Sequence, residues 1–164
     1  MVELVTVIVV MGILGAIGAS RFFDRGTFAG RAYADQAKSV IRYAQKLAIA
    51  QNRNVFVLAT PARLAVCFTA DCANAAVLAS PPGDSNSGST VTRAVCTLNN
   101  TYVANWLCEG TPANVTVGGI GATGTVFSFD PMGRPSFAAP LTLTFTSEGS
   151  VFPFTVEAET GYVH

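Results

Sequence analysis

The first stretch of the chain is almost purely apolar. From Leu4 to Ser20 it reads LVTVIVVMGILGAIGAS, without a charged side chain. As a helix rising about 1.5 Å per residue, these residues span roughly 25 Å, most of a hydrocarbon layer about 30 Å thick. Glu3 stands at the leading edge of the run, where a carboxylate in lipid is costly and therefore needs a partner or a function. The pattern predicts a membrane-spanning helix that carries one functional carboxylate.

Apolar positions spaced by three and four continue the helical pattern beyond this run. Polar side chains lie mostly between them, at Asp35, Lys38, Arg42 and Lys46. This periodicity is that of an amphipathic helix with one buried face. The positions predicted for the buried face are Tyr33, Ala37, Val40, Ala44, Leu47 and Gln51.

We therefore predict one long helix from Val2 to Asn52, which makes residues 1–52 the first structural unit. Residues 1–20 form its membrane and assembly half, and residues 28–52 form its amphipathic half. The amphipathic half is expected to lie along a soluble head, because its apolar face needs cover.

Alternation of apolar and polar residues predicts strands in the remaining residues, 53–164. Two short segments are expected to form a hairpin that turns at Pro61 and Ala62. Pro153 removes a ladder donor and places its strand at an edge or its side chain outward. The prediction is an α+β fold, with an antiparallel β-sheet head packed on the second half of the helix. The predicted strands are residues 54–60, 63–69, 115–117, 125–130, 141–145 and 151–157.

Residues 70–114 alternate only weakly and are expected to be irregular. A stretch of this length is unusual in a compact domain unless it is functional or cross-linked. The chain has four cysteines, which allow three pairings, and neighbour spacing favours Cys67–Cys72 and Cys96–Cys108. An even number of cysteines in a tethered β-rich head indicates an oxidising compartment such as the bacterial periplasm. The Cys-x4-Cys spacing without a nearby histidine disfavours a zinc site.

Charge is divided between the two parts of the chain although the formal total is zero. Residues 1–60 hold seven basic and three acidic residues, whereas residues 61–164 hold three basic and seven acidic residues. The basic residues of the second part are Arg63, Arg93 and Arg134. An acidic head is a poor surface for a polyanion, so binding of nucleic acid is not expected.

The sequence offers no convincing catalytic or cofactor site. Residues 119–124 match G-x-G-x-x-G, but a strand rather than a helix is expected to follow, so we interpret the match as a glycine-rich turn. The one histidine, His164, is expected to be solvated at a frayed end. Glu157 and Glu159 are expected to share the solvated face of a strand. We therefore predict no enzyme activity, no catalytic residue, no cofactor and no metal.

Small residues line one face of the apolar run. Gly12, Gly15, Ala16 and Ala19 have the small-xxx-small spacing that lets two helices approach closely in lipid. The alternative is an apolar helix that is simply rich in small residues. With Glu3 in front of it, this face is predicted to pack against another helix.

Three segments resemble proteins of the type IV pilin-like family. VELVTVIVVMGILGAIGASRFFD resembles the N-terminal segment of type IV pilin-like proteins, which begins with an aromatic residue, two further residues and V-E-L. RFFDRGTFAGRAYADQAKSVIRYAQKLAIAQ resembles minor pilins of mannose-sensitive haemagglutinin-type pili. FDPMGRPSF and VEAETGYVH resemble the minor pseudopilin H and FimT-like group of the type II secretion and pilus systems. The leader with its processing motif is absent, so we expect the natural start to lie upstream of Met1.

The resemblance implies a structural subunit of a type IV pilus or a type II secretion pseudopilus. It implies other pilin subunits, a prepilin peptidase that cleaves and N-methylates, and an inner-membrane assembly platform as partners. It further implies a single pass through the bacterial inner membrane with the head in the periplasm, then assembly into a filament that serves adhesion or protein secretion. Glu3 would act in assembly by neutralising the terminal amine of a neighbouring subunit.

Two alternatives remain at this stage. A minor pilin that captures DNA for uptake would need exposed basic side chains on the head. A secreted β-rich protein with a cleaved signal peptide would need a cationic segment before the apolar run, which the sequence lacks.

Overall fold

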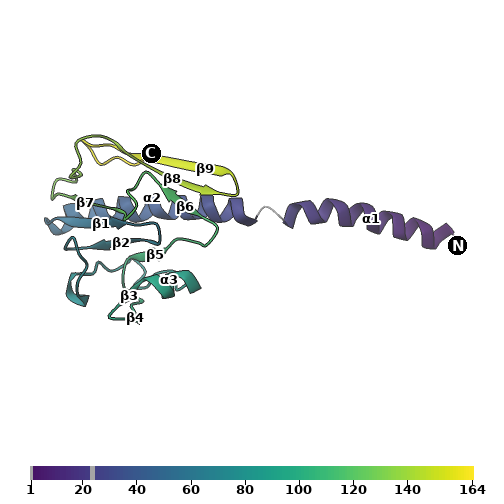
Figure 1. Cartoon of the computed structure of the whole chain (residues 1–164), viewed down its shortest axis with the longest axis horizontal. Coiled ribbons are helices and arrows are strands. Elements are labelled where there is room, and N and C mark those ends of the chain that lie inside the picture. Colours follow the sequence, from purple (N-terminus) through teal and green to yellow (C-terminus); the bar gives the residue numbers. More distant parts are fainter. Residues whose placement is uncertain (1, 23–24) are drawn as a thin grey trace.

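The N-terminal helix projects from the rest of the molecule. The computed structural model describes residues 2–22 and 25–164, with the side chains of residues 2–15 and 27–164. Helix α1 (Val2–Phe22) extends away from helix α2 (Arg25–Gln51), around which the strands gather (Figure 1). We call α2 with residues 53–164 the globular body. The predicted helix over residues 2–52 is helical on both sides of residues 23 and 24, which lie outside the described residues.

Helix α2 packs its small and apolar face against the strands. Four predicted positions of the buried face are confirmed, namely Tyr33, Ala37, Val40 and Ala44. Leu47 is only half-buried, and the prediction for Gln51 is wrong, because this residue is exposed at the end of the helix. Ile41 and Ala48, which the prediction left out, are also buried. Alanines on this face bring the strands close to the helix axis because they project only one methyl group.

Helix α2 ends in a defined C-terminal cap. Asn52 has a positive φ of 49°, and its amide donates to the carbonyl of Ile49. The amide of Arg53 donates to the carbonyl of Ala48. This pair of bonds is the Schellman arrangement, which satisfies carbonyls that the helix leaves open and turns the chain into the first strand.

The first sheet has four strands in the order β5-β2-β1-β7. The predicted hairpin is confirmed, because β1 and β2 pair antiparallel with Ala59 opposite Leu64 and turn at Pro61 and Ala62. Strand β1 buries alternate residues against the core. The four strands are β1 (Val55–Ala59), β2 (Arg63–Cys67), β5 (Cys108–Gly110) and β7 (Thr125–Phe129).

The second sheet has three strands in the order β6-β8-β9, so the prediction of a single sheet is wrong. Its strands are β6 (Thr116–Gly118), β8 (Leu141–Ser147) and β9 (Ser150–Val156). Each predicted strand is present, but β7 pairs with β1 whereas β8 pairs with β6 and β9. Local alternation identifies strands without identifying their partners, which explains the error. Pro153 is exposed on the edge strand β9, as predicted.

Aromatic side chains join the two sheets to α2. The rings of Tyr33 and Phe145 meet edge to face at 5.5 Å between centroids, and Phe145 stacks on Phe154 at 5.5 Å. Phe127 and Phe129, on β7 of the other sheet, meet edge to face at 5.7 Å. One apolar core therefore extends across both sheets and the helix.

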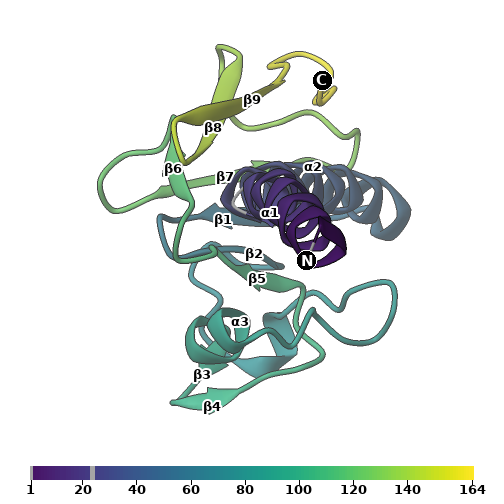
Figure 2. The same cartoon turned by 90° about the vertical axis from the view of Figure 1, so that its right-hand side faces the viewer.

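Residues 70–114 are more regular than the sequence predicts. They contain a short 3-10 helix, η1 (Ala75–Val77), the helix α3 (Thr90–Val95), and the strands β3 (Thr97–Leu98) and β4 (Thr101–Tyr102), as well as β5. The Ser89 side chain caps α3 by accepting from the amide of Thr92. In Figure 2 the three-stranded sheet lies at the top, and α3, β3 and β4 lie at the opposite end, beyond β2 and β5. The spacing of apolar residues does not predict elements this short, because each contains fewer than two periods of the helix or strand.

Two disulfides hold this region. Cys67 is bonded to Cys72 and Cys96 to Cys108, the two pairs that neighbour spacing favours. Trp106 is buried beside them, and its ring nitrogen donates to the carbonyl of Val66 over 3.1 Å. A second, smaller core thus forms below the first sheet.

No helix in the part of the chain that the structure describes combines the length and apolar character needed to cross a membrane. The predicted membrane span is therefore not found among these residues.

Candidate functional site

The part of α1 whose side chains are described, residues 2–15, has a largely apolar and uncovered surface. Its large apolar side chains are between 52% and 79% exposed. They occupy successive positions around the whole helix: Val2, Leu4, Val5, Val7, Ile8, Val9, Val10, Met11, Ile13 and Leu14. A helix that is apolar all round is stable only in apolar surroundings. This surface is the strongest candidate for a binding site in the described chain.

Glu3 is the one charged residue described on this surface, in the first turn of α1. The Thr6 hydroxyl bonds to the Glu3 backbone carbonyl at 2.9 Å and leaves the Glu3 carboxylate uninvolved. Among the residues with described side chains, Glu3 forms no ion pair. The carboxylate is thus available to a group from another molecule.

The predicted small-residue face is open where the structure describes it. A methyl group added at Gly12 or Gly15 would meet nothing within 4 Å. Ala16 and Ala19 lie in α1, but their side chains fall outside the described ones. Packing of another helix against this face therefore stays a prediction.

A buried carboxylate forms a polar cluster that sequence reasoning missed. Glu109 on β5 is 7% exposed. Its Oε1 accepts from the amide of Ser87 at 2.8 Å, and its Oε2 accepts from the hydroxyls of Ser87 at 2.5 Å and Thr92 at 3.0 Å. Such charge-assisted bonds hold the start of α3 against β5. The sequence signal for this cluster is the concentration of hydroxyl residues between Ser85 and Thr92. The preference of such residues for helix N-caps explains this concentration only in part.

Tyr33 connects α2 to this cluster. Its hydroxyl lies 3.1 Å from that of Thr111 and donates a long bond of 3.4 Å to the Glu109 carbonyl. Burial raises the pKa of Tyr33 to about 12, the Thr111 bond lowers it in part, and the Glu109 charge raises it further. The cluster contains carboxylate and hydroxyl groups but no histidine, and Glu109 and Thr92 are buried within it, whereas Ser87 is exposed. We assign it a structural role.

The three arginines of the head are engaged locally. Arg63 donates to the carbonyl of Val95 and lies 5.0 Å from the Trp106 ring, and burial lowers its pKa. Arg93 donates to the carbonyl of Gly88 and lies over Tyr102, whereas Arg134 contacts the sulfur of Met132. Arg63 and Arg93 therefore contact the 70–114 region, whereas Arg134 belongs to the turn after β7.

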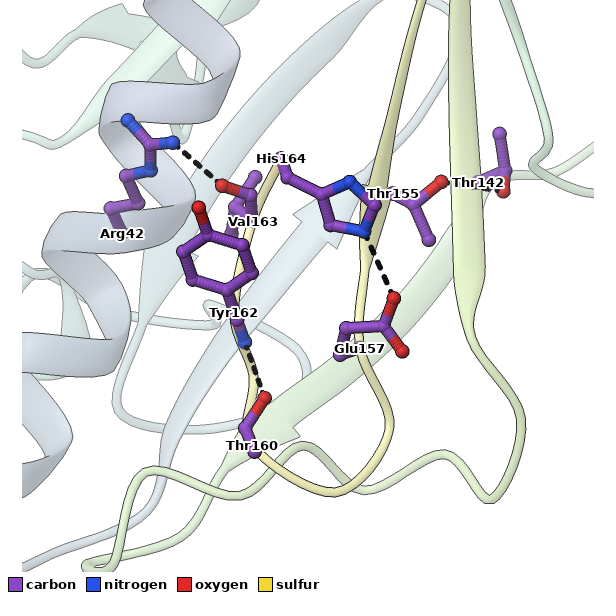
Figure 3. A network of polar contacts seen from close by, with 8 residues as sticks. All are labelled: Arg42, Thr142, Thr155, Glu157, Thr160, Tyr162, Val163 and His164. Atoms are coloured by element: carbon purple, nitrogen blue, oxygen red, sulfur yellow. Dashed lines mark hydrogen bonds and ion pairs between the residues drawn. The ribbon is translucent and has the colours of Figure 1, made fainter.

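The C-terminal segment is anchored, so the prediction of a frayed end at His164 is wrong. His164 and Thr155 exchange two backbone hydrogen bonds, and the His164 ring lies 2.9 Å from the Glu157 carboxylate. The Arg42 guanidinium donates to the Val163 carbonyl at 2.6 Å (Figure 3). Strand β9 ends at Val156, so the predicted pairing of Glu157 and Glu159 on a strand face is also wrong. The return of residues 157–164 alongside β9 accounts for both corrections.

Residues 119–124 form a turn between β6 and β7, with positive φ at Gly119 and Gly124, and no helix follows. Within residues 2–22 and 25–164, no three histidine, cysteine, aspartate or glutamate side chains gather as a metal site would require.

Comparison with solved structures identifies the class of fold. No family model and no curated protein matches the chain. The Pseudomonas aeruginosa type IV minor pilin FimU matches with a TM-score of 0.52 at 13% identity, over 82% of this chain and 85% of that one. A second crystal form of FimU gives 0.51 at 12% identity, over 82% and 90%. The Vibrio cholerae minor pseudopilin EpsH of the type 2 secretion system gives 0.46 at 13% identity, over 86% and 95%.

The chain therefore has a pilin-like α+β fold, with an N-terminal helix and antiparallel sheets. At such identities the likeness concerns the fold alone.

Proposed function

We propose that this chain is a minor pilin or pseudopilin, a structural subunit that joins a filament through α1. The observation that carries the proposal is the exposed apolar surface of residues 2–15 of α1 on a body of pilin-like fold. Apolar helices of neighbouring subunits would cover this surface and remove its apolar area from water. The proposal assigns the chain no catalytic role.

Glu3 would direct the packing. A lone carboxylate on an apolar helix is stable in a filament core only when an opposite charge neutralises it. The terminal amine of a neighbouring subunit is the proposed partner. The glycines and alanines at positions 12, 15, 16 and 19 would let the backbones of two helices approach closely.

The proposal extends to processing and location. A prepilin peptidase would release and N-methylate the N-terminus, and an inner-membrane platform would add the subunit to the filament. Before assembly α1 would rest in the inner membrane with the globular body in the periplasm, where the two disulfides are stable. The filament would be a pilus of the mannose-sensitive haemagglutinin type or a type II secretion pseudopilus.

The test compares Glu3→Ala with Thr6→Ala. Both changes shorten an exposed polar side chain near the start of α1, and only the first removes the charge. Removing one member of a buried ion pair costs about 3–5 kcal/mol, so Glu3→Ala should be nearly absent from isolated filaments while its cellular level stays normal. Thr6→Ala should assemble like the unchanged protein.

Immunoblots of sheared filaments and of whole cells measure both quantities. If Glu3→Ala assembled as well as Thr6→Ala, the proposed pairing would be wrong. If the unchanged chain were absent from filaments, the proposed function itself would fail.

A further inference from the structure

A groove lies where α2 begins beside the turn between β8 and β9. It has a volume of about 370 Å³ and is lined by Thr27, Phe28, Arg31, Ser150 and Phe152. In Figure 1 this turn lies at the end of the globular body from which α1 leaves. The groove therefore lies next to the solvent or lipid that surrounds α1.

One wall of the groove forms where the backbone of α2 at Gly30 lies very close to side chains of the β8–β9 hairpin. A methyl group added at Gly30 would lie 2.7 Å from Cβ of Ser147 and 3.1 Å from Cε2 of Phe152. Glycine at this position lets the β8–β9 hairpin lie directly on the first turns of α2. Phe152 can then form a wall of the groove beside Arg31.

The chemistry of the groove is cationic and aromatic. Among the residues with described side chains, Arg31 is the one charged residue in the lining, and it forms neither an ion pair nor a hydrogen bond with any of them. Thr27 and Ser150 contribute hydroxyl groups that can donate to an anion. Phe28 is 73% exposed.

We propose that this groove binds the headgroup of an anionic phospholipid. Arg31 and the two hydroxyls would hold the phosphate, and Phe28 would contact the upper acyl chains, as aromatic side chains do at membrane interfaces. The exposed Glu148 at the hairpin tip opposes an anion but does not line the groove.

A lipid is favoured over a second copy of the chain for a geometric reason. An apolar phase around α1 reaches the groove directly, because the groove lies where α1 meets the globular body. A second copy would have to bring one of its exposed carboxylates to Arg31 in one particular register. The inference rests on the proposed function only in placing α1 in a bilayer before assembly.

The experiment places a fluorescent reporter in the groove of the full chain. F28W is introduced at an exposed position, whereas the native Trp106 is buried in the other core and serves as an internal control. The protein is reconstituted in vesicles of phosphatidylcholine and phosphatidylglycerol at one fixed ratio. Brominated acyl chains, which quench tryptophan on contact, are carried in turn by one lipid and then by the other.

We expect stronger quenching when phosphatidylglycerol carries the bromine. One basic residue near an anionic surface is worth about 1 kcal/mol, which corresponds to an enrichment of about fivefold beside the reporter. Adding Arg31→Gln should abolish the difference between the two labelling schemes. Adding Arg93→Gln, on the distant α3, should leave the difference unchanged.

Equal quenching in the two schemes, or no quenching, would overturn the proposal. Quenching that falls as protein concentration rises at constant lipid would show that a second copy occupies the groove and would equally overturn it. Flotation of the same samples distinguishes failure of the groove proposal from failure of the proposed function. A chain that floats with the vesicles but shows no lipid preference disproves the groove alone, whereas a chain that does not float contradicts the membrane step of the proposed function as well.

Discussion

The amide of Gly110 donates a 3.1 Å hydrogen bond to the hydroxyl of Thr92, which in turn donates to the carboxylate of Glu109. This relay joins the edge strand β5 to α3 and leaves no space between them. A methyl group added at Gly110 would lie 2.8 Å from the amide nitrogen of Thr92. Because this nitrogen belongs to the backbone of α3, moving it aside would cost considerable free energy.

We therefore expect Gly110→Ala to lower the free energy of unfolding by about 1–3 kcal/mol, the usual cost of overpacking. Gly83→Ala is the matched control, because nothing lies within 4 Å of its added methyl group. Urea unfolding of the full chain in detergent, followed by the fluorescence of Trp106, measures both. Equal stability of the two variants would contradict the close approach.

Tyr33 should make the protein lose stability at high pH. Its folded pKa of about 12 exceeds the ordinary value of 10.0, so the unfolded chain releases this proton first as the pH rises. The contribution is complete below pH 10 and falls by about 2–3 kcal/mol as the pH reaches 12. Tyr33→Phe should remove this part of the pH dependence.

Unfolding of both proteins between pH 9 and pH 12 provides the test, since the other tyrosines and the lysines are common to both. Parallel curves for Tyr33→Phe and the unchanged protein would show that the hydroxyl is not buried against Thr111. A convergence of the two curves with rising pH is the expected result.

The disulfides should be complete and stabilising. Non-reducing peptide mapping of protein from the periplasmic side is expected to find Cys67–Cys72 and Cys96–Cys108, with no thiol open to alkylation. Closing a loop of about 13 residues contributes roughly 3 kcal/mol in the chain-entropy model, so Cys96→Ala with Cys108→Ala should lose about that much. Four reactive thiols would contradict both the pairing and the periplasmic location.

The head formed by residues 61–164 should not hold DNA, because it carries three basic and seven acidic residues. Phosphate neutralisation by lysine and arginine supplies most non-specific affinity, and the three arginines of the head are engaged with carbonyls, aromatic rings or sulfur. We expect no binding of the full chain below about 100 μM DNA at physiological salt, the weak end of non-specific affinity. Fluorescence titration in detergent measures this. Low-micromolar binding that weakens steeply with salt would favour a DNA-capture function instead.

Local pattern was sufficient for the elements that extend over several periods. The buried face of α2, the β1–β2 hairpin and the strands β7, β8 and β9 follow from spacing of apolar residues, because each repeats its period at least twice. The apolar character of α1 behind Glu3 could also be predicted from the sequence alone, because composition determines that this helix needs apolar surroundings. Neighbour spacing likewise favoured the two cysteine pairs.

Only the tertiary structure decided how these elements combine. The described strands form three sheets instead of one, because β7 pairs with β1 rather than with β8, and β3 pairs with β4. Alternation cannot specify these partners. The buried Glu109 carboxylate accepts hydrogen bonds from the hydroxyls of residues 87 and 92. The Val163 carbonyl accepts a hydrogen bond from Arg42, 121 residues earlier. The sequence determines which faces must be covered, whereas long-range contacts determine what covers them, because burial and strand pairing depend on residues far apart in the chain.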